Sequence, residues 1–134
     1  MFIHTLTESE QRAFFGLAKE LIVSDGRIVE AETNAIRQIE LETGINSDDI
    51  PRADASNADV IAALRGKKAR TATLLELMGI ACVDRDYHPL ENAMIRSVAE
   101  ALGVSENELL PMENWVLRQM ALAAEADGFF AEEN

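Results

Sequence analysis

The chain repeats part of its own pattern after 59 residues, and this duplication limits the folds open to it. The shift superimposes five pairs of identical residues: Asp25 and Asp84, Glu32 and Glu91, Ile36 and Ile95, Arg37 and Arg96, Gly44 and Gly103. Each copy has the same order, namely an apolar helix, an acidic turn, a second helix and a glycine stop. A single helical hairpin cannot cover its own apolar stripe, so we expect two pseudo-symmetric hairpins that pack face to face.

Apolar residues recur at helical spacing wherever the pattern is strong. The clearest stripe is Phe14, Leu17, Ala18, Leu21 and Ile22, and no segment alternates with the period of two that a strand would show. The sequence therefore predicts an all-α bundle of about seven helices. Their expected ranges are 8–24, 29–43, 57–65, 69–84, 89–102, 106–110 and 112–126.

Local signals mark the helix ends. Thr7–Glu10 and Ser105–Glu108 fit the capping-box pattern, and Pro89 suits a first helical turn. Pro111 is expected to separate a short helix from the last long one. Left-handed C-caps are expected at three glycines: Gly44, Gly66 and Gly103.

One domain is expected over residues 1–134. It comprises a first repeat at about 8–50, a connector at 51–68, a second repeat at about 69–110 and a terminal helix at about 112–126. The polar segment 46–59 is expected on the surface. Hydrophobic residues of the last helix, Met112, Trp115 and Met120, are expected to pack in the core, and Phe129 and Phe130 to fold back onto it.

Composition and charge narrow the function classes. The chain has 134 residues, 48% of them hydrophobic, and a formal net charge of −12. Such an acidic surface disfavours nucleic acid and anionic lipid and attracts cations or basic partners. No secretory leader or membrane span is visible, and the single cysteine, Cys82, is expected to be a buried apolar residue. These features predict a cytoplasmic protein that does not insert into a membrane.

The duplicated segments resemble those of the tellurite-resistance TerB-like family, which includes the N-terminal domain of a membrane-anchored DnaJ-like co-chaperone. The first copy reads SDGRIVEAETNAI and the second VDRDYHPLENAMIRSVAEALGVSENEL. The likeness covers roughly residues 10–126. It implies a compact all-helical domain, a bacterial stress response and a divalent metal held by acidic residues: Asp25, Glu32, Asp84 and Glu91. The second copy departs from the pattern at Arg85, where the turn glycine is expected, and at Tyr87, where isoleucine is expected.

Two interpretations account for the acidic turns. In the first, Asp25 and Asp84 cap helix starts, and Glu32 and Glu91 favour the first turn of the following helices through the macrodipole. Capping explains a single copy completely. In the second, the two turns meet in space, and the carboxylates need a cation because two of them about 4 Å apart repel by roughly 4 kcal/mol at an effective dielectric of 20.

The second turn carries further candidate ligands, because Asp86 and His88 lie between Asp84 and Glu91. Carboxylate oxygens favour Ca²⁺, Mg²⁺ or Mn²⁺ over Zn²⁺, whereas a histidine favours a transition metal. Neither turn is an EF-hand, since Arg27 and Val29 occupy positions that such a loop gives to acids. The complete candidate metal set is Asp25, Glu32, Asp84, Asp86, His88 and Glu91.

A basic segment, RGKKAR, begins the first helix of the second repeat. Its cations are Arg65, Lys67, Lys68 and Arg70. Cations at a helix start oppose the macrodipole, so the segment is either a partner-binding patch or a solvated loop that balances nearby acids. No catalytic motif is present, and we expect no enzyme. The leading function is a stress-response module that binds a divalent cation. The alternatives are a metal-independent protein-interaction domain, which uses the basic segment or the terminal helix, and a helical bundle that binds a small molecule.

Overall fold

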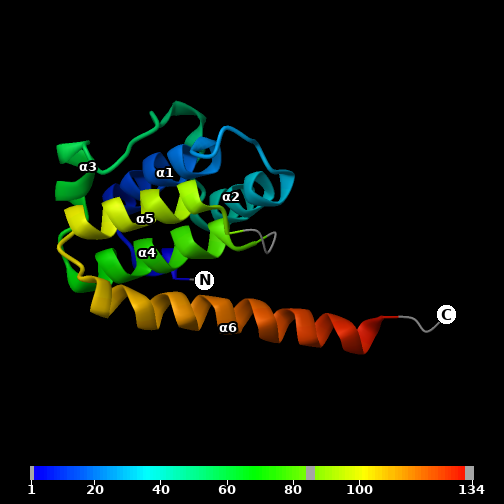
Figure 1. Cartoon of the computed structure of the whole chain (residues 1–134). Helices are drawn as coiled ribbons and strands as arrows, with labels where there is room; N and C mark the ends of the chain where they lie inside the picture. The colour runs from blue at the N-terminus through cyan, green and yellow to red at the C-terminus, as the bar shows by residue number, and fades with distance from the viewer. Residues whose placement is uncertain (1, 84–86, 132–134) are drawn as a thin grey trace.

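The computed structural model describes residues 2–83 and 87–131, and within these ranges the protein is all-α (Figure 1). It has six α-helices and two 3-10 helices: η1 Ile3–Thr5, α1 Glu8–Val23, α2 Glu30–Thr43, η2 Ser47–Asp49, α3 Ala58–Ala63, α4 Lys67–Ala81, α5 Pro89–Ala101 and α6 Glu106–Phe130. The predicted class is confirmed, although the count is six instead of about seven. Symmetric packing of two whole hairpins stays a prediction.

The predicted helix starts hold, and one predicted stop does not. Thr7 and Ser105 each form a reciprocal capping box with the glutamate three residues later, and Pro89 is the first residue of α5. Gly44 and Gly103 adopt φ values of 73° and 77°, as left-handed helix stops require. Gly66, in contrast, has a φ of −79° and precedes α4, because α3 already ends at Ala63.

The core is built around α1 and α4, which pack against each other at the centre of the bundle. Phe14, Phe15 and Leu17 of α1 and Leu77 of α4 are fully buried. The rings of Phe14 and Phe15 pack edge to face, with their centroids 5.6 Å apart. Burying a side chain of this size contributes about 1.5–3 kcal/mol, so these few residues supply much of the stability. The expected burial of Cys82 is confirmed.

The connector after η2 is more than a surface loop. Ile50 and Ala53 are buried, and the Ala53 N–H donates to the Gly16 carbonyl in the middle of α1 at 3.0 Å. Lys19 donates from Nζ to the carbonyls of Ser47 and Ile50 at 2.8 and 2.7 Å. The polar side chains of the connector face water, while Ile50, Ala53 and its backbone bind to α1.

α6 is one continuous helix, so the predicted break at Pro111 is wrong. Pro111 lacks the N–H that would donate to the carbonyl of Asn107, but Asn107 is exposed, so water can bind that carbonyl instead. The apolar stripe of Leu109, Met112 and Val116 continues on both sides of the proline. Met112, Trp115 and Met120 pack against the core as expected. No helix among the described residues is long and apolar enough to cross a bilayer.

The end of α6 projects beyond the other helices (Figure 1). Leu122, Phe129 and Phe130 are 61%, 80% and 86% exposed. The expectation that the two phenylalanines fold back onto the core is therefore wrong. α6 continues straight as a helix to Phe130, and this geometry carries both rings away from the bundle.

Candidate metal centre

The first acidic turn lies between α1 and α2 and is organised around Asp25. Its Oδ1 accepts the backbone N–H of Arg27 at 2.9 Å, and Gly26 between them has a φ of 78°. The Asp25 side chain is only 2% exposed, and the Arg27 guanidinium lies 3.5 Å from its Oδ2. The backbone N–H of Arg27 is the main cause that lowers the pKa of Asp25; burial opposes it, and the charges of Arg27 and His88 add to it. The carboxylate is thus held ionised.

Glu32 and Glu91 occupy the same place in the two repeats. Each is the third residue of its helix, α2 or α5, and each is only 1% exposed. Glu91 Oε1 accepts the backbone N–H of His88 at 3.3 Å. Burying an ionised carboxylate costs several kcal/mol unless nearby charges and hydrogen bonds offset it. Sequence spacing identified both residues but gave no sign that they are buried.

His88 caps α5 and also brings the two turns into electrostatic contact. Its Nδ1 accepts the N–H of Leu90 at 3.1 Å, so the other ring nitrogen, Nε2, carries the hydrogen and acts as a donor. Its charge lowers the pKa of Asp25, so the second turn lies within electrostatic reach of the first. Figure 1 shows the end of α4 and the start of α5 at the same end of the bundle as the segment between α1 and α2.

The remaining predicted ligands, Asp84 and Asp86, lie outside the described residues. Within residues 2–83 and 87–131, no group of three or more His, Cys, Asp or Glu side chains is placed to hold a metal ion. The predicted ligands that the structure does describe, Asp25, Glu32 and Glu91, carry oxygen donors, but they do not form such a group. This donor set fits a hard divalent cation in its chemistry.

The basic segment is partly absorbed into the fold. Arg70 donates from Nη1 to the Leu102 carbonyl at the end of α5, at 3.1 Å. Arg65 donates from Nε to the nearby Ala62 carbonyl at 3.0 Å. Lys67 and Lys68 are exposed, and Lys67 and Arg70 border a small hollow beside Glu108 of α6. Hydrogen bonds from Ser105 are the main cause that lowers the pKa of Glu108, and the charges of Arg70 and Lys67 add to it.

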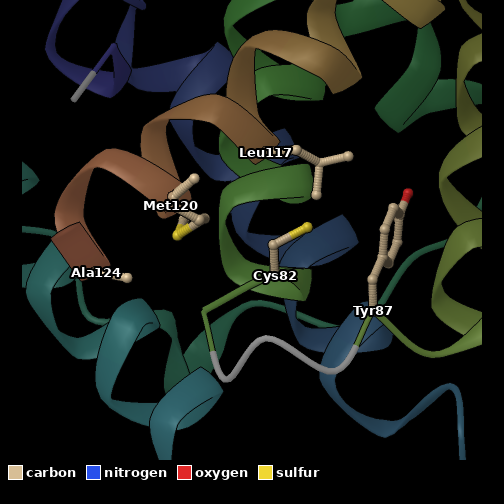
Figure 2. A pocket seen from close by; sticks show the side chains of 6 residues that line it. Cys82, Tyr87, Leu117, Met120 and Ala124 are labelled. Carbon is tan, nitrogen blue, oxygen red and sulfur yellow. The ribbon is translucent and has the colours of Figure 1, made fainter.

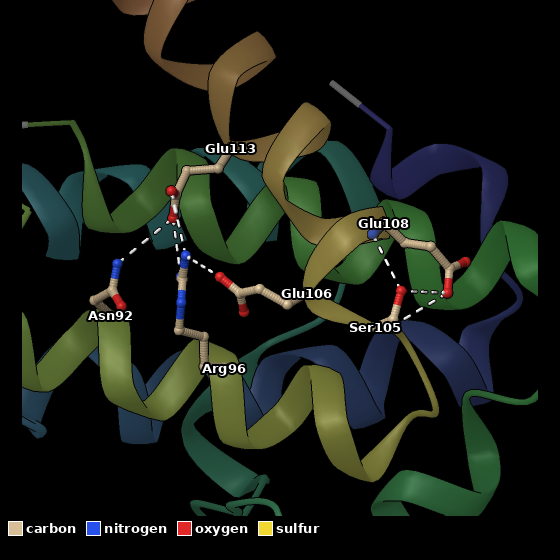
Figure 3. Close-up of polar contacts among 6 residues, drawn as sticks. All are labelled: Asn92, Arg96, Ser105, Glu106, Glu108 and Glu113. Carbon is tan, nitrogen blue, oxygen red and sulfur yellow. Dashed lines mark hydrogen bonds and ion pairs between the residues drawn. The ribbon is translucent and has the colours of Figure 1, made fainter.

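An ion-pair network between α5 and α6 has no counterpart among the predicted sites (Figure 3). Arg96 contacts Glu113 at 3.0 Å and Glu106 at 3.1 Å, and Asn92 donates to Glu113 at 3.5 Å. The hydrogen bond to Glu113 is the main cause that raises the pKa of Arg96. The sequence does contain a signal for it, because Glu106 and Glu113 are seven residues apart and so share one face of a helix.

A small apolar pocket of about 200 Å³ lies where α6 passes the end of α4 (Figure 2). Its walls include Cys82, Tyr87, Leu117 and Met120. Burial raises the pKa of the Tyr87 phenol, and the negative charge of Glu113 adds to the effect. Ligand sites usually enclose about 300–1,000 Å³, so the pocket is small for a cofactor-sized molecule.

Comparison with protein families gives one match, to the family described as tellurite resistance protein TerB, over residues 11–114. This range includes both acidic turns and the first turns of α6. No curated protein matches the chain significantly, and neither does any solved structure.

Proposed function

Because the chain belongs to the tellurite-resistance TerB family, we propose that it is a non-catalytic, cytoplasmic stress-response module that binds a divalent cation through its inter-helix turns. The observation that carries the proposal is the burial of Glu32 and Glu91, each 1% exposed at the same position of its helix. Both carboxylates already make interactions within the protein. A cation bound beside them would add a favourable charge in a chain of net charge −12.

The proposed ligands are oxygen atoms of Asp25, Glu32, Asp84 and Glu91, with Asp86 and His88 as further candidates. Oxygen donors favour Ca²⁺, Mg²⁺ or Mn²⁺ over Zn²⁺. Arg27 lies beside Asp25 and would compete with the cation for its Oδ2. His88 would join the ligands only after giving up its hydrogen bond from Leu90, because a ring whose Nδ1 accepts an N–H carries its own hydrogen on Nε2. The cation would lower the repulsion between the turns and so link metal binding to the stability of the bundle.

Thermal unfolding of chelator-treated protein tests the proposal. Adding Ca²⁺, Mg²⁺ or Mn²⁺ should raise the midpoint temperature of unfolding of the native protein. Once the ion concentration exceeds the dissociation constant, the rise should grow with the logarithm of that concentration. Combining Glu32→Gln with Glu91→Gln should abolish this rise. The matched control combines Glu30→Gln with Glu100→Gln, which also removes two carboxylates but from exposed positions, and it should keep the rise. An equal rise in both variants would contradict the proposed ligands.

A second function, protein interaction, is favoured by the exposed apolar surface of α6. Leu117, Leu122, Phe129 and Phe130 are all more than 40% exposed on one helix. Clustered exposed apolar side chains are typical of interaction surfaces. Of the basic segment, Lys67 and Lys68 remain open to a partner, whereas Arg70 is bound to α5. Loss of a partner on charge reversal of Lys67 and Lys68, but not on Phe129→Ser with Phe130→Ser, would assign the interaction to the basic segment.

A further inference from the structure

The outer surface of α2 is equivalent, by the 59-residue repeat, to a surface of α5 that α6 covers. Near α2 a shallow hollow is lined by Arg37, Glu40, Leu41, Gly44, Ile45 and Asn46. Near α5 a second hollow contains the residues that the 59-residue shift predicts, including Arg96, Gly103, Val104 and Ser105. The two hollows are thus equivalent positions of the two repeats, each beside an arginine and a left-handed glycine.

On the α5 side, the first turns of α6 form part of the hollow. Glu106 and Leu109 line it, Leu109 is 1% exposed, and Arg96 is held between Glu106 and Glu113. The segment of α6 that binds this hollow is therefore a helix in which Glu106, Leu109 and Glu113 have the spacing Glu-x-x-Leu-x-x-x-Glu. Its carboxylates bind the arginine, and its leucine fills the space beside the glycine turn.

On the α2 side, the equivalent of α6 lasts for only one turn: η2 corresponds to residues 106–108, and the buried Ile50 corresponds to Leu109. The chain forms the short η2 and then crosses α1, to which its backbone is bound through Ala53. Arg37 is exposed and makes no ion pair within the part of the chain that the structure describes. Leu41 is 78% exposed, at the position where the second repeat has the polar Glu100. A cation and an apolar side chain are thus open to solvent side by side.

We propose that this α2 surface, formed by Arg37, Leu41 and residues 44–46, binds an acidic amphipathic helix of a partner protein. The partner's helix takes the position on α2 that α6 takes on α5 beyond its first turn, which η2 and Ile50 already occupy. Charge complementarity selects an acidic ligand, because Arg37 lacks the two glutamates that its counterpart Arg96 holds. Leu41 favours an amphipathic helix over a free anion, since an anion would leave its apolar surface in water. This inference is independent of the proposed cation site.

The probe that tests it is a peptide with the sequence of residues 105–117, held helical by a hydrocarbon bridge between positions 107 and 114. Circular dichroism establishes its helicity before use. Titration into the isotope-labelled protein, followed by amide proton–nitrogen NMR, should shift the signals of Arg37, Leu41 and Gly44 in a saturable way. No saturable shift at these residues at millimolar peptide would overturn the proposal.

Charge exchange makes the test specific. Arg37→Glu should weaken peptide binding at least tenfold, and a peptide with lysine in place of Glu106 and Glu113 should regain binding to that variant. Arg12→Glu, an equal charge change at an exposed position of α1, is the matched control and should leave the affinity unchanged. The amide spectrum of each variant verifies its fold. Shifts confined to Arg96 and its neighbours would show that the peptide only displaces α6. Equal affinity for Arg37→Glu and Arg12→Glu would show that Arg37 does not bind the peptide. Either result would contradict an α2 site.

Discussion

Arg96 of α5 binds Glu113 of α6 through two parallel contacts, Nη1 to Oε2 at 3.0 Å and Nη2 to Oε1 at 3.3 Å. Both side chains are mostly covered, at 28% and 16% exposure. A two-point contact fixes direction as well as distance, so it sets the angle at which α6 leaves the bundle.

Breaking this pair should loosen α6. We expect a coupling of about 1 kcal/mol between Arg96→Ala and Glu113→Ala in a double-mutant cycle, toward the upper end of the range for exposed pairs because of the fork geometry. Urea unfolding measures the free energies. Arg118→Ala with Glu113→Ala forms the control cycle, since Arg118 is exposed and donates from Nε to the Asn114 carbonyl. Equal coupling in both cycles would remove the special role of Arg96.

Asp25 should make folding depend on pH at the acidic end. Its pKa is lowered in the folded state from a usual value of 3.8, mainly by the Arg27 N–H. The folded state therefore binds the proton less readily than the unfolded chain. The resulting stability is fully present above the unfolded pKa and is lost as the pH falls through the folded pKa.

Comparison of the native protein with Asp25→Asn between pH 2 and 6 measures this contribution. The stability difference between the two should shrink as the pH falls below about 4. Asp59→Asn, at an exposed position, is the matched control. A pH-independent difference for Asp25→Asn would mean that its folded pKa is not lowered.

Two helical glycines should respond in opposite directions to alanine. A Cβ on Gly79 of α4 would meet no atom within 4 Å, so Gly79→Ala should stabilise by about 0.5–1 kcal/mol. A Cβ on Gly16 of α1 would lie 3.1 Å from the Pro51 carbonyl oxygen and 3.2 Å from the Ala53 Cβ. Because that connector is bound to α1, Gly16→Ala should destabilise by about 1–2 kcal/mol. Equal stabilisation by both, in urea unfolding, would show that the connector yields freely.

The free end of α6 should contribute little to global stability. Phe129→Ser with Phe130→Ser should change the free energy of unfolding by less than about 0.5 kcal/mol, because both rings are exposed. Amide exchange should be fast after Ala124, beyond which every described residue is exposed, and slow around Val116. A loss of more than about 1 kcal/mol would mean that the rings pack against the core in solution.

Sequence reasoning succeeded where the cause is local. Thr7, Pro89 and Ser105 mark helix starts because capping involves only the next three residues. It failed at Pro111 and at Phe129, where the outcome depends on whether a tertiary surface lies opposite. The seven-residue spacing of the acids identified Glu32 and Glu91 as equivalent. Their burial comes from neighbouring helices, which spacing alone does not specify. Likewise, the match of Arg37 with Arg96 was visible, but only the structure reveals that one is paired and the other exposed.

Isothermal titration calorimetry of the chelator-treated protein with Ca²⁺ and Mn²⁺ measures directly whether the acidic turns bind a divalent cation. We expect saturable binding with a defined stoichiometry. This binding should be lost when Glu32→Gln and Glu91→Gln are combined, and it should be kept when Glu30→Gln and Glu100→Gln are combined. Absence of saturable heat for these ions and for Mg²⁺ at millimolar concentration would contradict cation binding and leave the acidic turns as helix caps.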